Sequence, residues 1–163
     1  MHDGLIYVDG GCVDLGEFAP FPPAISAPAV LPRSPSLATI QSLQMALADA
    51  PQVNIPVEHF FADSLYARKM TMQAGEVVIG KLHKSKHFGV LLTGVVDVWE
   101  PGCAKKRITA PAFLTTTPGT KRVIHALTQT EWITFHGTEH TDPALIEADI
   151  IEPETHLLTG DAT

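Results

Sequence analysis

Two histidines lie on either side of a short turn near the middle of the chain. His83 and His87 are separated by Lys84-Ser85-Lys86, and β-branched, apolar runs precede and follow them. On one straight strand, residues four apart are separated by roughly 13 Å, which is too far for their side chains to share an ion. Metal–imidazole bonds are about 2.0–2.1 Å long, so both rings must approach the same ion closely. Two imidazoles that face each other across a tight turn can do so. The spacing therefore predicts either a pair of metal ligands or two turn histidines exposed to solvent.

Two further histidines are candidates for a third ligand. His125 lies in the apolar run 123–126, where it is either a structural histidine or a ligand that a β-bulge turns inward. His136 ends an expected strand, and its alternation places it on the opposite face from Ile133 and Phe135. We therefore leave His136 outside the candidate ligand set, and His125 stays open as a structural histidine or a third ligand.

The residues around these histidines are expected to form short strands, because β-branched and large apolar residues alternate with turn-forming ones. Strands spaced roughly eight to twelve residues apart are typical of an all-β sandwich or barrel. A chain of 163 residues can bury one such core as a single domain. The expected strands are Ser64–Met72, Val77–Leu82, His87–Leu92, Val95–Trp99, Ala104–Thr109, Lys121–Leu127 and Glu131–His136.

The flanking segments differ from the barrel in composition. Six prolines between Glu17 and Pro35 predict an extended arm, because proline excludes a helix or a central strand. An apolar stripe from Leu37 to Leu47 predicts a helix that ends before Pro51. The chain thus divides into a hairpin and arm (1–35, with strands at 5–8 and 12–15), a helix and linker (36–56), a barrel (57–137), and a final helix at 144–151 with an acidic tail (138–163).

Charge is unevenly distributed along the chain. Residues 1–67 carry a net charge of −6, residues 68–122 carry +7, and residues 123–163 carry −8, which gives −7 in total. The acidic flanks are expected either to fold back on the basic barrel or to contact another subunit's barrel, and a basic mouth for an anionic ligand is the further alternative. Nucleic acid is not expected as a partner, because basic residues are few and the overall charge is acidic.

Other features bear on cellular location. The sequence has no apolar run long enough for a transmembrane helix and no cationic start followed by an apolar stretch, so we expect neither a membrane span nor a secretory signal. Cys12 and Cys103 lack the C-x-x-C spacing, and we expect free thiols in a reducing cytoplasm, with one disulfide between them as the alternative.

The segment from Gly75 to Gly94 resembles the first motif of the cupin superfamily, G-x5-H-x-H-x3-E-x6-G. Every spacing is kept, but the first histidine position holds Lys81 and the glutamate position holds His87. The second cupin motif, G-x5-P-x-G-x2-H-x3-N, fits Pro111–Ala126 less well: Gly119 matches, and its histidine position holds Arg122. The resemblance covers roughly residues 70–137. It implies a single antiparallel jelly-roll barrel.

The resemblance also implies a site inside that barrel. Three imidazoles from His83, His87 and His125 would suit a divalent metal such as Zn, Fe or Mn, as in three-histidine cupin oxygenases. Lys81 and Arg122 would point into the same cavity, and fixed positive charges oppose a divalent cation unless an anion lies between them. Otherwise these two cations form a pocket for a carboxylate or phosphate, which arginine binds through paired hydrogen bonds.

Three functions are compatible with these residues. The first is a small cupin that binds a metal ion or an anionic small molecule, with oxygenase chemistry as the enzymatic option. The second is a non-enzymatic assembly protein, since cupin-like jelly rolls also occur in bacteriophage particles, which would place this chain in a virion. The third is a ligand-sensing cupin. No carboxylate base for an isomerase or hydrolase is evident, so we favour binding over catalysis and expect a homo-oligomer, or an assembly with other subunits, formed through the N-terminal arm.

Overall fold

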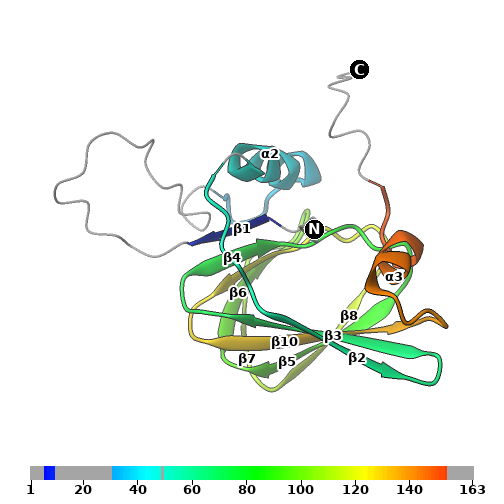
Figure 1. Cartoon of the computed structure of the whole chain (residues 1–163). Coiled ribbons are helices and arrows are strands. Elements are labelled where there is room, and N and C mark those ends of the chain that lie inside the picture. Colours follow the sequence, from blue (N-terminus) through cyan, green and yellow to red (C-terminus); the bar gives the residue numbers. More distant parts are fainter. Residues whose placement is uncertain (1–5, 10–30, 49, 154–163) are drawn as a thin grey trace.

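The chain folds into two five-stranded antiparallel sheets that face each other (Figure 1). The computed structural model describes residues 6–9, 31–48 and 50–153. The first sheet has the order β1 (Ile6–Asp9), β4 (Glu76–Ile79), β9 (Val123–Ala126), β6 (Val95–Trp99) and β7 (Lys106–Thr109). The second has the order β2 (Val57–Ala62), β3 (Leu65–Met72), β10 (Thr130–Gly137), β5 (His87–Thr93) and β8 (Ala112–Thr116).

The path of the chain between the sheets defines a jelly roll. From β3 onward, successive strands change sheet at every step except the β6–β7 hairpin. Each strand of the second half returns beside a strand of the first half, so that β9 lies between β4 and β6, and β10 between β3 and β5. The expected all-β, antiparallel jelly-roll barrel is therefore confirmed. So are the helix before the barrel and the helix after it.

The barrel core lies between the two sheets. It is formed by alternate, inward-facing residues such as Met72 and Leu91 of the second sheet and Val96 of the first, each fully buried. Gly94 makes the β5–β6 hairpin possible: it has a φ of +89°, and a Cβ there would collide with the Gln129 carbonyl. This is the second glycine of the motif that frames the two histidines.

Helix α2 (Leu37–Ala48) covers the outer face of the first sheet (Figure 1). The helix begins where the Thr39 amide donates to the Ser36 hydroxyl at 3.1 Å. Its apolar stripe is buried against outward-facing residues of β4, β6 and β9, so this sheet is covered on both faces. The cluster consists of Leu31, Ile40, Leu43, Leu47, Val77, Ile79, Trp99 and Val123.

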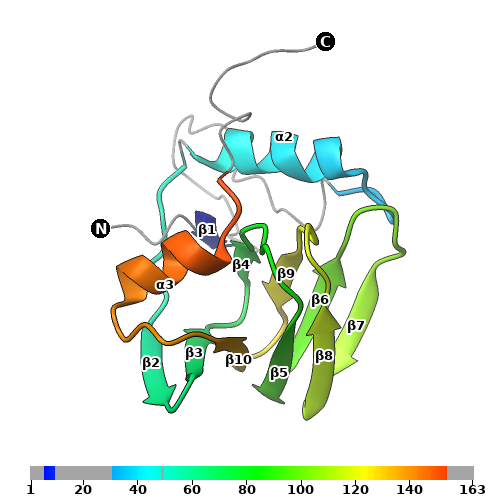
Figure 2. The same ribbon diagram turned by 90° about the vertical axis from the view of Figure 1, so that its right-hand side faces the viewer.

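Helix α3 (Pro143–Ile150) lies across one open end of the barrel (Figure 2). Asp142 caps it by accepting a hydrogen bond from the Ala144 amide at 2.9 Å. Ile146 and Ile150 are buried against Tyr66 of β3 and anchor the helix to the second sheet. No helix within the described residues is both long and apolar enough to cross a membrane.

Several boundaries differ from those expected. Strands β2 and β8 were not among the expected strands, and the strand expected at 77–82 ends at Ile79, before a glycine that weakens strand structure. His83 therefore lies in the β4–β5 loop. The first expected strand pairs with β4 as β1, whereas its expected partner at 12–15, most of the proline-rich arm and the acidic tail from 154 lie outside the described residues.

Candidate metal centre

Three histidines meet at the end of the barrel that α3 covers. One ligand atom from each of His83, His87 and His136 lies within 4.8 Å of the other two. The ring centroids are 4.2 Å apart for His83–His87, 4.5 Å for His87–His136 and 5.1 Å for His83–His136. His87 and His136 are buried, and His83 is partly exposed. Three imidazoles this close can hold one metal ion.

The register of the second sheet brings His87 and His136 together. Strand β10 pairs with β5 so that Phe135 lies opposite Phe88, and the next step along both strands brings His136 beside His87. Strand β3 lies on the other side of β10, with Tyr66 opposite His136. The two histidines thus project from adjacent strands into the barrel, at the level of the Tyr66 ring.

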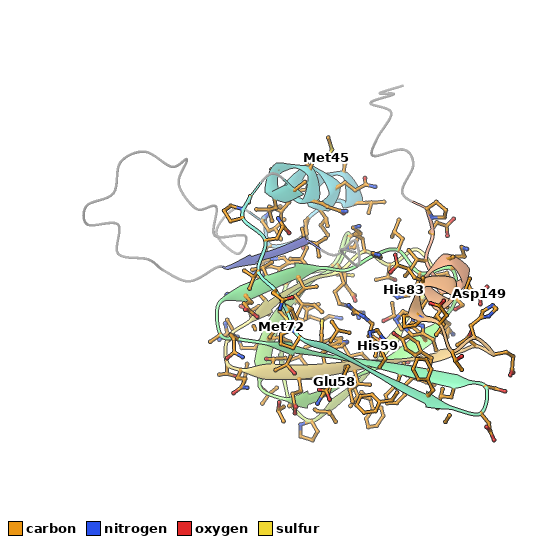
Figure 3. The ribbon with its side chains drawn as sticks, in the orientation of Figure 1. Met45, Glu58, His59, Met72, His83 and Asp149 are labelled. Carbon is orange, nitrogen blue, oxygen red and sulfur yellow. The ribbon has the colours of Figure 1, made fainter. Side chains whose placement is uncertain are left out.

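His83 reaches the cluster from the β4–β5 loop, which α3 holds in place. His83 forms an isolated antiparallel bridge with Ile151, directly after the helix. The Lys84 amide donates to the Ile150 carbonyl at 2.9 Å, and the Glu152 amide donates to the Leu82 carbonyl at 2.9 Å. His83 lies on the side of the barrel that faces α3 (Figure 3). The third imidazole is therefore positioned by a segment that comes late in the chain.

Burial keeps the three imidazoles neutral. Burial lowers the pKa of His83 to about 3, with smaller contributions from His87 and His136. Burial likewise lowers the pKa of His136 to about 3, and its neighbours His87 and Arg68 add to the effect. The pKa of His87 is lowered by burial and, to a smaller extent, by Arg122. Neutral imidazole is the form that coordinates metal ions.

The hydrogen bonds of these rings fit a ligand role. Nδ1 of His87 lies 3.3 Å from the Ser85 carbonyl, which leaves Nε2 available to a metal when Nδ1 carries the proton. Nδ1 of His136 is buried and has no hydrogen-bond partner among the described residues. A buried polar atom without a partner is costly, and a bound ion or an ordered water would satisfy it. The donor set thus fits a metal.

Lys81 and Arg122, the two predicted cationic residues, line the same cavity as the histidines. Each is paired with a carboxylate: Lys81 with Glu147 of α3, and Arg122 with Glu100. Arg122 also donates to the Thr116 hydroxyl at 3.0 Å and lies over the Trp132 ring. The electrostatic objection to a metal at this site is therefore reduced, because neither cation faces the histidines as an uncompensated charge.

The structure does not bring His125 to the other two predicted ligands. His125 lies on β9 between Val77 and Asp97, on the face of the first sheet that points away from the barrel interior. No bulge is present in the β9 pairings, so His125 keeps the regular alternation and faces opposite to Arg122. Burial lowers its pKa, while the nearby Asp97 carboxylate opposes that shift.

His136 takes the place that the sequence analysis gave to His125. The alternation that was expected is present, with His136 and Ile133 on opposite faces of β10. However, the apolar Ile133 and Phe135 face outward, and His136 shares the inner face with Trp132 and Thr130. The signal that could have identified His136 was the alternate set of residues on β10 that faces inward: Thr130, Trp132, Thr134 and His136. This set is more polar than the outward-facing Ile133 and Phe135, so it was not recognised as the inner face.

The cluster opens into a cavity of about 1380 Å³. Its lining combines the three histidines with Arg68 and Thr134 one step deeper along the second sheet, and then with Met70 and Trp132. His59 and Tyr66 also line it, and the His59 Nδ1 lies 2.7 Å from the Tyr66 hydroxyl. The cavity therefore has a metal-ligating end, a polar middle and an apolar floor.

Comparison with known proteins returned structures but no sequence relatives. No protein-family model matches the chain, and no curated protein matches it. One similar solved structure is an acetylacetone dioxygenase from Acinetobacter johnsonii, at 13% identity and a TM-score of 0.43, with an alignment that covers 51% of this chain and 59% of that one. The alignment therefore spans less than two thirds of the dioxygenase.

Two other solved structures are aligned over more of their length. KdgF from Halomonas sp. is 18% identical, with a TM-score of 0.47 and coverage of 56% of this chain and 87% of that one. A cupin superfamily protein from Desulfitobacterium hafniense DCB-2 is 13% identical, with a TM-score of 0.45 and coverage of 66% and 94%. The strand order of the two sheets is itself that of an antiparallel jelly roll.

Proposed function

We propose that this protein binds a divalent metal ion in its barrel through His83, His87 and His136. The observation that carries the proposal is the convergence of three ligand atoms within 4.8 Å of one another. Their pKa values, lowered by burial, keep the imidazoles in the metal-binding form at neutral pH. The pairing of Lys81 with Glu147 and of Arg122 with Glu100 further supports a bound cation at this site.

The ion is expected to be Zn²⁺, Fe²⁺ or Mn²⁺. Imidazole ligands suit zinc and iron in particular, and three protein ligands leave a coordination position for water or substrate. A metal held in this way supplies a Lewis acid that polarises a bound ligand. The residues that line the cavity would orient that ligand. Helix α3, which covers the open end of the barrel, would limit the entry of water.

We further propose that an anionic small molecule binds beside the metal. A divalent ion held by three neutral imidazoles carries its full charge into the site, and an anion would compensate it. Arg68 adds positive charge, which is felt at His83 and His136 as a lowering of their pKa values. Met70 and Trp132 would contact the apolar part of such a molecule. A small carboxylate has this combination of an anionic group and an apolar body.

Metal titration of the unmodified protein and of two variants tests the ligand set. The apoprotein should bind one equivalent of Co²⁺ with the visible absorption of a low-coordinate site, and Zn²⁺ should displace it. His136→Ala should lose this binding by at least ~100-fold in affinity, because two imidazoles make a poor site. Acetate added to the Co²⁺-loaded protein should shift the spectrum when it enters the coordination sphere.

His125→Ala is the matched control for this experiment. It removes the same side chain from the outer face of the first sheet, so Co²⁺ affinity should stay within about twofold of the unmodified protein. Loss of the metal in His125→Ala together with its retention in His136→Ala would overturn the proposed ligand set. Absence of stoichiometric binding of Co²⁺ and Zn²⁺ by the unmodified protein would overturn the metal proposal itself.

The alternative of a structural role in an assembly, as in a bacteriophage particle, stays a prediction. It depended on the proline-rich arm, most of which lies outside the described residues. Deleting residues 1–35 and measuring the mass in solution addresses it, because an arm that mediates assembly must change the oligomeric state when it is removed.

A further inference from the structure

The outer face of the second sheet is apolar and exposed. Phe60, Phe88 and Phe113 are 47%, 58% and 83% exposed, and each comes from a different strand of this sheet. Helix α2 covers the first sheet and α3 covers one end of the barrel, so neither described helix lies over this face (Figures 1 and 2). Exposed aromatic side chains that gather on one face commonly mark an interaction surface.

The strand register arranges these residues in two adjacent rows, which we call the outer apolar face. One row crosses the sheet from edge to edge and consists of Phe60, Ala67, Phe135, Phe88 and Thr115. The next row consists of Glu58, Lys69, Ile133, Val90 and Phe113. Apolar residues therefore run continuously across all five strands, and polar residues are confined to the ends of the rows.

The charges on the outer apolar face compensate each other. Lys69 lies 2.5 Å from a Glu58 carboxylate oxygen and 3.4 Å from one of Glu131. These three residues lie together on β2, β3 and β10, away from Phe88 and Phe113. A strongly charged partner would find no opposite field here. Two copies of a chain with a net charge of −7 repel each other. Contact through a nearly neutral face keeps this repulsion lower than contact through an acidic face.

The size of the face also fits self-association. Five strands about 4.8 Å apart, which are five to eight residues long, give the whole outer face of the second sheet an extent of roughly 24 by 22 Å, or ~500 Å² per copy. Two copies packed face to face would bury roughly 1,000 Å², which is the size of a weak, transient interface. A two-fold pair uses the same patch on both subunits, so one apolar face suffices and the contact closes.

We propose that the outer apolar face binds a second copy of this chain, forming a two-fold dimer. This proposal is independent of the metal site, because the face and the histidines lie on opposite sides of the same sheet. In such a dimer the open end of each barrel, which α3 covers, would lie away from the interface. The modest buried area predicts a dimer whose population depends on concentration.

Sedimentation equilibrium of the full chain over a range of concentrations tests the proposal. The mass should approach twice the 17.5 kDa of one chain as the concentration rises. The double variant Phe88→Glu/Phe113→Glu should remain at the monomer mass at every concentration, with at least a ~100-fold weaker dimer. Both side chains are exposed, so the far-ultraviolet circular dichroism spectrum of the double variant should match that of the unmodified protein. The single variant Phe113→Ser provides a milder change at the most exposed position.

Two controls place the same chemistry elsewhere on the surface. Met45→Glu on α2 and Leu145→Glu on α3 introduce the same charge at residues 57% and 53% exposed, and both should retain the dimer. The proposal is overturned if the unmodified chain stays monomeric into the high micromolar range, or if a folded Phe88→Glu/Phe113→Glu variant still dimerises. It is equally overturned if removal of residues 1–35 abolishes the dimer while the double variant preserves it.

Discussion

The buried titratable side chains of this barrel differ in charge: the histidines that face its interior are neutral, and a carboxylate on the outer face of the first sheet is ionised. The three histidines of the candidate metal centre are uncharged because burial disfavours their protonated form. Asp97, on the outer face of the first sheet, stays charged although only 3% of it is exposed. Arg107 donates to it at 2.8 Å and Lys105 at 3.0 Å, and these bonds lower its pKa against the opposing effect of burial.

The Asp97 carboxylate should therefore stabilise the fold in a pH-dependent way. Its native pKa lies below the ordinary value of 3.8, so its contribution is present above pH 3.8 and is lost as the pH falls through the native pKa. Asp97→Asn should cost ~1–3 kcal/mol at pH 7 in urea denaturation, as expected for hydrogen bonds to a charged group. The difference from the unmodified protein should shrink below pH 3.8. An equal difference at pH 7 and at the lowest pH that keeps the fold would contradict this explanation.

At the scale of residues, spacing predicted proximity better than orientation. The four-residue interval between His83 and His87 correctly indicated that they approach across a turn. His136 was left out because apolar residues were assumed to face inward, which is wrong for Ile133 and Phe135 on the exposed face of the second sheet. Alternation along a strand gives two opposite faces, but one sequence does not say which face is buried when both are apolar.

At the scale of elements, α3 both covers the cavity and supports the loop that carries His83. Its last residues hydrogen-bond to the loop that carries His83, and Glu147 on the same helix compensates Lys81. The final helix was predicted from the sequence, but its contacts were not, because they join residues that are more than sixty positions apart. Strands β2 and β8 were missed because polar and apolar residues occur on both of their faces, so their alternation is weak.

Loosening α3 should therefore weaken both the fold and the metal centre. Ile146 is 1% exposed and packs with Tyr66, so Ile146→Ala should reduce the free energy of unfolding by ~2–4 kcal/mol. Co²⁺ affinity should fall at the same time, because the His83 loop loses its support. Leu145→Ala, at a neighbouring position that is 53% exposed, should change stability by less than ~0.5 kcal/mol and leave metal affinity unchanged. Retention of full metal affinity in a destabilised Ile146→Ala protein would contradict the supporting role of α3.

At the scale of the whole molecule, the charge pattern of the sequence reappears as contacts. The basic middle of the chain meets acids from both flanking segments: Glu58 and Glu131 contact Lys69, and Glu147 contacts Lys81. Glu58 and Glu131 lie on strands of the barrel itself, whereas Glu147 lies on α3, so at this contact the C-terminal flank folds back on the barrel. Composition could predict this complementarity, but not which acid meets which base.

Metal binding should also appear as stability of the entire domain. An ion that binds only the native state stabilises it by about 2.7 kcal/mol at 100 times its dissociation constant. For a chain of 163 residues this corresponds to a rise in Tm of ~5–10 °C, measurable by calorimetry with and without Zn²⁺. His125→Ala should show the same rise and His136→Ala none. A rise of equal size in His136→Ala would mean that Zn²⁺ stabilises the protein from a different site.

The bridge between His83 and Ile151 has a consequence for biosynthesis. Chains emerge from the ribosome N-terminus first, and domains fold as their residues become available. His87 and His136 can take their places once β10 pairs with β5, but the loop that carries His83 gains its hydrogen bonds only after residues 150–152 have been made. The candidate metal centre is therefore completed last during translation, so a nascent barrel would not capture an ion through all three histidines before the final helix docks.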